Sequence, residues 1–124
     1  MQYMLLIYDN EQLLANLSAE EGRRMHEQYM QFTTEIQSSG HYRAGDALQS
    51  VRTATTVRIR ETKHSITDGP FAETREQLGG YYLIEASDLD EALKIAARVP
   101  SAHTGSIEVR PLVTSYDEPI SYQR

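Results

Sequence analysis

The sequence predicts an α+β fold in which one β-sheet carries two helices on a single face, the ferredoxin-like arrangement. Two strand–helix–strand patterns follow one another along the chain and are joined by short connections. Both predicted helices have one apolar stripe, which must be buried against a sheet. The 124 residues include no low-complexity segment and suffice for one hydrophobic core but not for two, so we expect a single domain.

The first predicted strand and helix come at the start of the chain. The run from Tyr3 to Tyr8 is apolar and aromatic, which predicts a central strand covered on both faces. Ser18 and Glu21 have the spacing of a capping box, so a helix is predicted from there to about Ser39. Gly40 is suited to end this helix in the left-handed conformation. The apolar stripe of the helix comprises Met25, Tyr29, Phe32 and Ile36.

The middle of the chain predicts a short extended segment and then a β-hairpin. His41–Leu48 is the extended segment, and its neighbouring glycines favour an irregular path. Thr55–Arg60 and His64–Thr67 are rich in β-branched residues and flank a three-residue turn. Arginines alternate with apolar residues in the first of these strands, as in a strand with one solvated face; an anion site is the alternative interpretation. The alternating residues are Val57, Arg58, Ile59 and Arg60.

The next strand, Gly80–Ala86, is expected to leave apolar surface in need of a partner. We expect Tyr82, Ile84 and their neighbours on the sheet face that lies away from the helices. A second copy of the chain is the simplest cover for such a face, so we predict a homodimer with the sheets face to face. The domain is expected to span residues 1–113, and the weakly patterned tail 114–124 to be mobile or to lie on the partner subunit.

The second helix and the last strand complete the pattern. Asp88 and Glu91 have the capping spacing again, and Pro100 stops the helix. Ser106–Leu112 alternates apolar and charged residues and predicts the last strand. The buried face of this helix is expected to comprise Leu89, Ala92, Leu93, Ala96 and Ala97.

Composition and charge exclude several classes of function. The net charge of −6 argues against a nucleic-acid-binding protein, which needs clustered Lys and Arg. The absence of Cys removes disulfides and thiol chemistry and fits a reducing compartment. No apolar run is long enough for a membrane span and no signal peptide is visible, so we expect a cytoplasmic protein. The four His residues lack the spacing of a metal site, and no cofactor-binding motif is present. We therefore expect neither a bound metal ion nor a cofactor.

The segment from Asp68 to Gly80 is the strongest candidate for a functional loop. It joins the hairpin to the next strand over about a dozen residues, and loops of this length commonly bind ligands or act as lids. Asp68, Gly69 and Pro70 predict a turn, in which the Asp68 side chain would accept backbone N–H bonds. The glycine pair before Tyr81 predicts a bulge or a close backbone approach at the start of the strand.

His26 is the other residue with a chemical interpretation. It follows Met25 and therefore lies at the border of the apolar stripe of the first helix. A histidine there either packs against the core border or acts as a general acid or base, since its ordinary pKa is near 6.5. The second role requires a polar or acidic partner from elsewhere in the fold.

Three groups of residues resemble the DGPF-domain branch of the YCII-related proteins. They are Asp68–Thr74, Glu76–Tyr82 and Glu108–Pro111, and the resemblance extends from the first strand to about Leu112. It implies a ferredoxin-like subunit that forms a dimeric α/β barrel, with a cleft between the first helix and the sheet.

The resemblance also implies a site. A His on the first helix and an Asp before the Gly that ends it are the proposed catalytic pair of the wider family, one branch of which dehydrochlorinates an aromatic substrate. His26 matches the His, but Ser38 and Ser39 stand where the Asp is expected. Asp68 is the alternative carboxylate and, failing that, Glu73 or Glu76.

The remaining site candidates are the aromatic residues Phe71 and Tyr81, which are expected to form an apolar pocket wall or to pack in the core. Glu73 and Glu76 either bind ligand or belong to a solvated loop. Three functions follow from these observations. One is a small-molecule binder or enzyme with His26 and Asp68 in its cleft, and another is a non-catalytic accessory protein of an extracytoplasmic-function sigma factor. The third is a dimeric scaffold in which the loop only seals the dimer.

Overall fold

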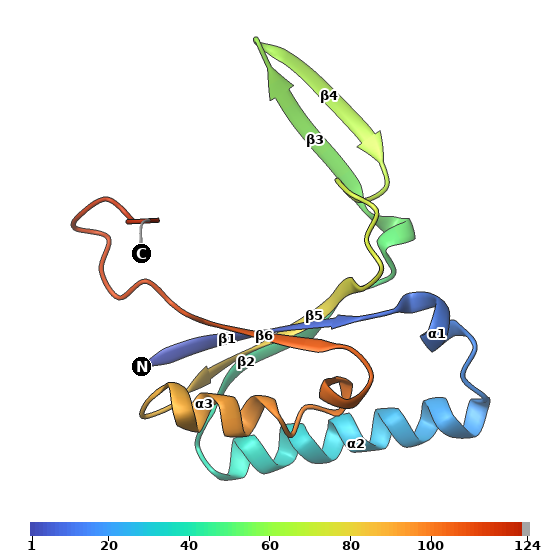
Figure 1. Cartoon of the computed structure of the whole chain (residues 1–124), viewed down its shortest axis with the longest axis vertical. Coiled ribbons are helices and arrows are strands. Elements are labelled where there is room, and N and C mark those ends of the chain that lie inside the picture. The colour runs from blue at the N-terminus through green and yellow to red at the C-terminus, as the bar shows by residue number, and fades with distance from the viewer. Residues whose placement is uncertain (123–124) are drawn as a thin grey trace.

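The sheet at the centre of the fold has four antiparallel strands in the order β2-β5-β1-β6. The computed structural model describes residues 1–122. The strands are β1 (Gln2–Asp9), β2 (Tyr42–Ala47), β5 (Gln77–Glu85) and β6 (Ser106–Pro111). The helices α2 (Ala19–Ser38) and α3 (Leu89–Ala96) lie under one face of this sheet (Figure 1). The predicted ferredoxin-like α+β fold is confirmed.

Both helices begin where the capping patterns predict. The Ser18 hydroxyl accepts the Glu21 N–H at 3.1 Å, and the Glu21 carboxylate accepts the Ser18 N–H at 3.1 Å. Asp88 caps α3 by accepting the Glu91 N–H at 2.9 Å. Gly40 follows α2 with a φ of +82°, the left-handed conformation expected of a glycine at a helix end.

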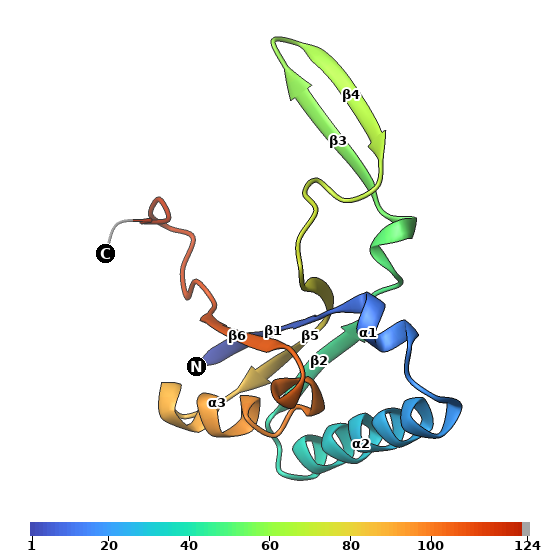
Figure 2. The same cartoon turned by 45° about the vertical axis from the view of Figure 1, so that its right-hand side comes forward.

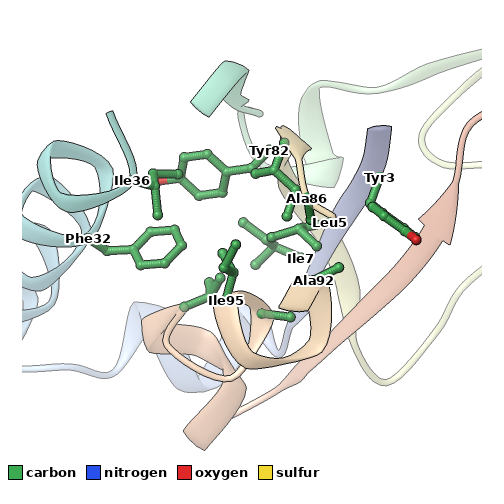
Figure 3. Packing of buried hydrophobic residues seen from close by; sticks show 12 residues of the cluster. Tyr3, Leu5, Ile7, Phe32, Ile36, Tyr82, Ala86, Ala92 and Ile95 are labelled. Carbon is green, nitrogen blue, oxygen red and sulfur yellow. The ribbon is translucent and has the colours of Figure 1, made fainter. Parts of the chain in front are cut away.

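The hydrophobic core lies between the sheet and the two helices (Figure 3). Every second residue of β1 faces it, and Phe32 and Ile36 of α2 contribute the largest buried side chains on the helix side. The buried core residues are Tyr3, Leu5, Ile7, Phe32, Ile36, Tyr82, Ile84, Ala86, Ala92, Ile95, Ala96 and Val99.

The placement of Tyr82 and Ile84 away from the helices was wrong. Leu5 pairs with Tyr82 and Tyr3 with Ile84, and residues directly opposite each other in an antiparallel pair share a face. The Tyr82 ring therefore packs edge-on against Phe32, with ring centroids 5.2 Å apart, as Figure 3 shows. The outer face of the sheet, defined here by its apolar residues, carries Met4, Leu6, Tyr8, Tyr81 and Leu83, all of them half-buried. Within residues 1–122 no helix or strand covers the outer face of β1 (Figure 1). The expectation that the strand Tyr3–Tyr8 is covered on both faces is therefore not met in a single chain.

The predicted hairpin forms, but it stands outside the main sheet. Its strands β3 (Thr55–Arg60) and β4 (Lys63–Asp68) make a separate two-stranded sheet. This arm, residues 55–68, projects from the side of the sheet opposite the helices (Figures 1 and 2). The place at the edge of the main sheet is taken by β2, which the sequence predicts only as a short extended segment.

The glycine pair at the start of β5 has the predicted geometry. Ile7 pairs with Gly80 and Tyr8 with Leu78, so Gly79 is the extra residue of a β-bulge. A Cβ atom on Gly80 would lie 2.8 Å from the Asp46 carbonyl oxygen, so the backbones of β5 and β2 approach closely there. The strand begins at Gln77, three residues before the predicted start.

Three short helical segments were not predicted: α1 (Glu11–Ala15) and the 3-10 turns η1 (Val51–Thr53) and η2 (Pro100–His103). Asn10 caps α1, and its side chain accepts the N–H of Gln12 at 2.9 Å. After β6 the chain leaves the sheet and runs to residue 122 without further regular structure (Figure 1). Among the helices of residues 1–122, none combines the length and the apolar character that a membrane span requires.

Candidate functional site

An open cleft of about 1360 Å³ lies at the root of the arm. We call it the loop cleft. Its walls come from α1, from η1 and from the long loop, residues 69–76, which connects β4 to β5. The lining residues are Asn10, Glu11, Gln12, Leu14, Ala15, Asn16, Leu48, Ser50, Val51, Arg52, Gly69, Pro70, Ala72, Glu73, Thr74, Arg75, Gln77 and Gly79.

Glu11 and Gln77 tie the three walls together. The Glu11 carboxylate accepts the Ser50 hydroxyl at 2.6 Å and the Val51 N–H at 3.0 Å, which joins α1 to η1. The Gln77 side chain accepts the Glu11 N–H at 2.9 Å and donates to the Thr74 carbonyl at 2.5 Å, which joins α1 to the long loop. The three bonds of Glu11 connect residues 39 to 66 positions apart, so the cleft is held by tertiary contacts.

Gly69 anchors the beginning of the long loop. Its N–H donates to the Ala54 carbonyl at 2.7 Å, and its own carbonyl accepts the Thr56 hydroxyl at 2.8 Å. Its φ of +107° is a conformation that glycine adopts without strain. Further along, the Phe71 carbonyl accepts a bond from the Arg58 guanidinium at 3.3 Å. The chain therefore bends at Gly69, but within residues 1–122 the Asp68 side chain does not accept the backbone N–H bonds expected of it.

The charged side chains of the loop cleft are two arginines and two glutamates. Arg52 and Arg75 are exposed, and within residues 1–122 neither forms an ion pair or a side-chain hydrogen bond. Glu11 is engaged in the wall contacts, whereas Glu73 is exposed and lines the cleft. The cleft thus combines the guanidinium groups of Arg52 and Arg75 with the carboxylate of Glu73. Its apolar surface comes from Leu14, Leu48, Val51, Pro70 and Ala72.

The structure separates the two residues of the expected catalytic pair. His26 is exposed on α2, beneath the sheet, and its side chain contacts no polar group of residues 1–122. Asp68 is the last residue of β4, on the arm above the sheet (Figures 1 and 2). A single chain does not bring them together, because the sheet lies between their two elements.

The other predicted site residues are also dispersed. Of Phe71, Glu73, Glu76 and Tyr81, only Glu73 lines the loop cleft. The Phe71 side chain is 76% exposed, and Glu76 accepts the Ser106 hydroxyl at 2.8 Å. Tyr81 is on the outer face and donates to the Asp46 carboxylate at 2.8 Å, a bond that raises the pKa of the Tyr81 phenol.

A second polar group lies between β1, α2 and η2 and was not predicted. Asp9 is only 5% exposed, and its carboxylate accepts the Thr104 hydroxyl at 2.8 Å and the Asn10 N–H at 3.0 Å. The Tyr29 and Ser101 hydroxyls share a hydrogen bond of 2.5 Å, and burial raises the pKa of Tyr29. The one sequence signal for this cluster is a carboxylate directly after a buried strand.

No three His, Asp or Glu side chains of residues 1–122 are grouped so that they could hold a metal ion.

The comparisons with known proteins agree with this fold. The model of the YCII-related domain matches residues 1–115. The chain belongs to the YCII-related family. An uncharacterized protein of Rhizobium meliloti (strain 1021) is 38% identical over 114 residues, which are 90% of this chain and 92% of that protein. Its description adds no activity.

A solved structure of similar fold comes from Burkholderia phenoliruptrix AC1100. It is 5-chloro-2-hydroxyhydroquinone dehydrochlorinase in complex with 2,5-dihydroxybenzoquinone. The likeness has a TM-score of 0.54 at 10% identity and covers 93% of this chain and 96% of that chain. At this identity it supports the common fold of the two proteins and carries no residue role.

In this YCII-related protein the loop cleft is the place where unpaired donors, a carboxylate and apolar surface converge. Guanidinium groups bind carboxylates and other oxygen acceptors, and apolar walls exclude water from such contacts. The chemistry of the cleft therefore suits a small organic ligand that has oxygen substituents.

Proposed function

We propose that this YCII-related protein binds a small oxygen-substituted organic molecule, such as a hydroxylated aromatic ring, in the loop cleft. The observation that carries the proposal is the pair of unpaired arginines, Arg52 and Arg75, in a cleft with an apolar wall. Ligand sites combine mostly apolar walls with a few polar groups in this way. The 2,5-dihydroxybenzoquinone held by the dehydrochlorinase of similar fold supports the choice of ligand class.

The enzymatic form of the proposal uses His26 as an acid or base. His26 is exposed on α2 and therefore accessible, but it has no carboxylate partner in residues 1–122. His26 also does not line the loop cleft, so within one chain it cannot act on a ligand bound there. We therefore base the proposal on binding alone. The accessory role beside a sigma factor stays a prediction from the family resemblance.

Replacement of Arg75 by Met tests the binding site. We expect 2,5-dihydroxybenzoquinone or a related hydroxylated benzoate to bind the wild-type chain in calorimetry. Arg75→Met and Arg52→Met should each weaken that binding about tenfold to a hundredfold, since a hydrogen bond to a charged group is worth roughly 1.5–3 kcal/mol.

Arg23→Met is the matched control. Arg23 is an exposed arginine of α2, away from the cleft, and its replacement should leave the affinity unchanged. If Arg75→Met, Arg52→Met and Arg23→Met all bind with the affinity of the wild type, the ligand binds outside the loop cleft. If no hydroxylated aromatic compound binds the wild type, the proposed ligand class is wrong.

A further inference from the structure

The arm is amphipathic, and its apolar face is uncovered. The pairing places Val57 opposite Ile66 and Ile59 opposite His64, so these four side chains share one face. Val57, Ile59 and Ile66 are 62%, 55% and 71% exposed. The opposite face is polar and basic and comprises Thr56, Arg58, Arg60, Lys63, Ser65 and Thr67.

One chain does not provide the packing that such an arm requires. Within residues 1–122 neither β3 nor β4 packs extensively on any other helix or strand, and both views show the arm standing clear of the domain (Figures 1 and 2). An isolated two-stranded hairpin is at best marginally stable in water. The apolar face therefore indicates that the arm is stabilised by another surface.

The exposed area of the chain is that of a subunit rather than of a free monomer. The chain exposes 9505 Å², whereas a compact monomer of 14.1 kDa exposes about 6700 Å². The difference, about 2800 Å², is more than the roughly 800 Å² that each partner buries in a standard interface. A second chain that buries a standard interface area can therefore cover the arm, and each chain would still expose more surface than a compact monomer of the same mass.

A second copy of this chain fits the exposed surface. The arm and the outer face lie on the same side of the molecule, so a two-fold axis can bring the arm of each copy to the body of the other (Figure 1). The charges also agree, because residues 55–68 have three cations and two carboxylates, whereas the other residues have nine cations and sixteen carboxylates. The net charges of +1 and −7 attract one another.

We propose that the arm docks with the face of Val57, Ile59 and Ile66 on a second copy of the chain, and that this docking completes the loop cleft. The arm is joined to the domain through η1 on one side and the long loop on the other, and both segments line the cleft. Within one chain Glu11 and Gln77 hold these segments to α1, and a docked arm fixes them from their other end as well. This second part of the proposal rests on the proposed function, but the docking does not.

Ile66→Glu and Thr67→Glu form a matched pair of variants that tests the docking. The two residues are neighbours on β4, both exposed, and lie on opposite faces of the arm. In light scattering coupled to gel filtration we expect the wild type and Thr67→Glu to be dimers and Ile66→Glu to be a monomer. A dimer of Ile66→Glu as stable as the wild-type dimer, or a monomeric wild type at high micromolar concentration, would overturn the docking.

Hydrogen exchange gives a second measurement that does not depend on a variant. The amides of residues 55–68 should be protected in the concentrated wild type and should lose protection on dilution below the dimer dissociation constant. Rapid exchange of these amides in the dimer would show that the arm is not part of the interface.

Binding of 2,5-dihydroxybenzoquinone to the two variants separates the two parts of the proposal. A monomeric Ile66→Glu with at least tenfold weaker ligand binding than Thr67→Glu supports the completion of the cleft by the partner. A monomeric Ile66→Glu with unchanged ligand affinity overturns that completion and leaves the docking supported. If the dimer depends on Ile66 but neither the wild type nor a variant binds a ligand, the proposed function is overturned and the docking remains supported.

Discussion

Asp9 shows what a single buried carboxylate contributes to this fold. It is 5% exposed, and the bond that it accepts from Thr104 joins β1 to the segment that follows η2, whereas the bond from the Asn10 N–H is local. A charge in such a place is stabilised only while its hydrogen bonds are kept, because burial removes the solvation it has in water. The Thr104 hydroxyl is therefore a structural group of the domain.

Thr104→Val should destabilise the protein by about 1–3 kcal/mol, the usual cost of leaving a buried acceptor without its donor. The free energy of unfolding measured in urea gives the comparison. Thr114→Val, an exposed threonine of the tail without a hydrogen bond in residues 1–122, serves as the control and should change stability by less than about 0.5 kcal/mol. Equal effects of the two changes would show that the Asp9 contact contributes nothing.

The candidate site illustrates which residue roles a sequence can reveal. The length of the segment after Asp68 predicted a functional loop, and in the structure this loop lines the cleft, with Glu73 among its lining residues. Glu11 and Gln77 gave no signal, because the bonds that join the cleft walls across the fold span 39 or more positions and each residue alone looks like an ordinary surface side chain. The predicted pairing of His26 with Asp68 required knowledge of the side of the sheet on which the hairpin lies, which no local pattern contains.

At the scale of elements, helix starts were the most predictable feature, whereas α3 ends at Ala96, before the predicted stop at Pro100. Capping boxes depend on residues three positions apart, so Ser18 with Glu21 and Asp88 with Glu91 identified both starts. The helix α1 has five residues and is too short for an apolar period to be visible. The faces of β5 could not be assigned because both faces of the neighbouring β1 are apolar, and a period of two does not distinguish them.

The Glu21 cap makes stability depend on pH. Its bonds with the backbone and hydroxyl of Ser18 lower the pKa of Glu21 from its ordinary value of 4.5. Since the folded pKa lies below the unfolded one, the contribution of Glu21 is present above pH 4.5 and is lost as the pH falls through the folded pKa.

Glu21→Gln should therefore lower the urea midpoint at pH 7 and have less effect near pH 3. Glu20→Gln, its exposed neighbour in the first turn of α2, is the control and should change the midpoint less at either pH. A Glu21→Gln effect of the same size at both pH values would contradict the role of the ionised carboxylate.

For the whole molecule, the prediction of a ferredoxin-like α+β fold was correct because element order and amphipathic helices determine how the layers pack. The position of the arm was not predictable in the same way. A hairpin that packs on a partner has the same alternation of apolar and polar residues as one that packs within its own chain.

Removal of residues 114–124 should leave the domain fold intact. Within residues 1–122, the last backbone hydrogen bond to the sheet joins the Leu112 N–H to the Gln2 carbonyl, and it is kept in a chain that ends at Val113. We expect the free energy of unfolding of the shortened chain to stay within about 0.5 kcal/mol of the wild type under conditions where both are monomers. A loss of more than about 1 kcal/mol would show that the tail is part of the domain.

The path of the chain between β2 and β5 has a consequence for how this protein can change. These two strands are neighbours in the sheet, with Ala47 paired to Gly80, so everything between them leaves and returns at a single point. That excursion contains the arm and the long loop, whereas every core residue lies outside it. Insertions and substitutions there can change the arm and the long loop while the scaffold keeps its packing, which makes this segment a separable module on the framework of strands and helices.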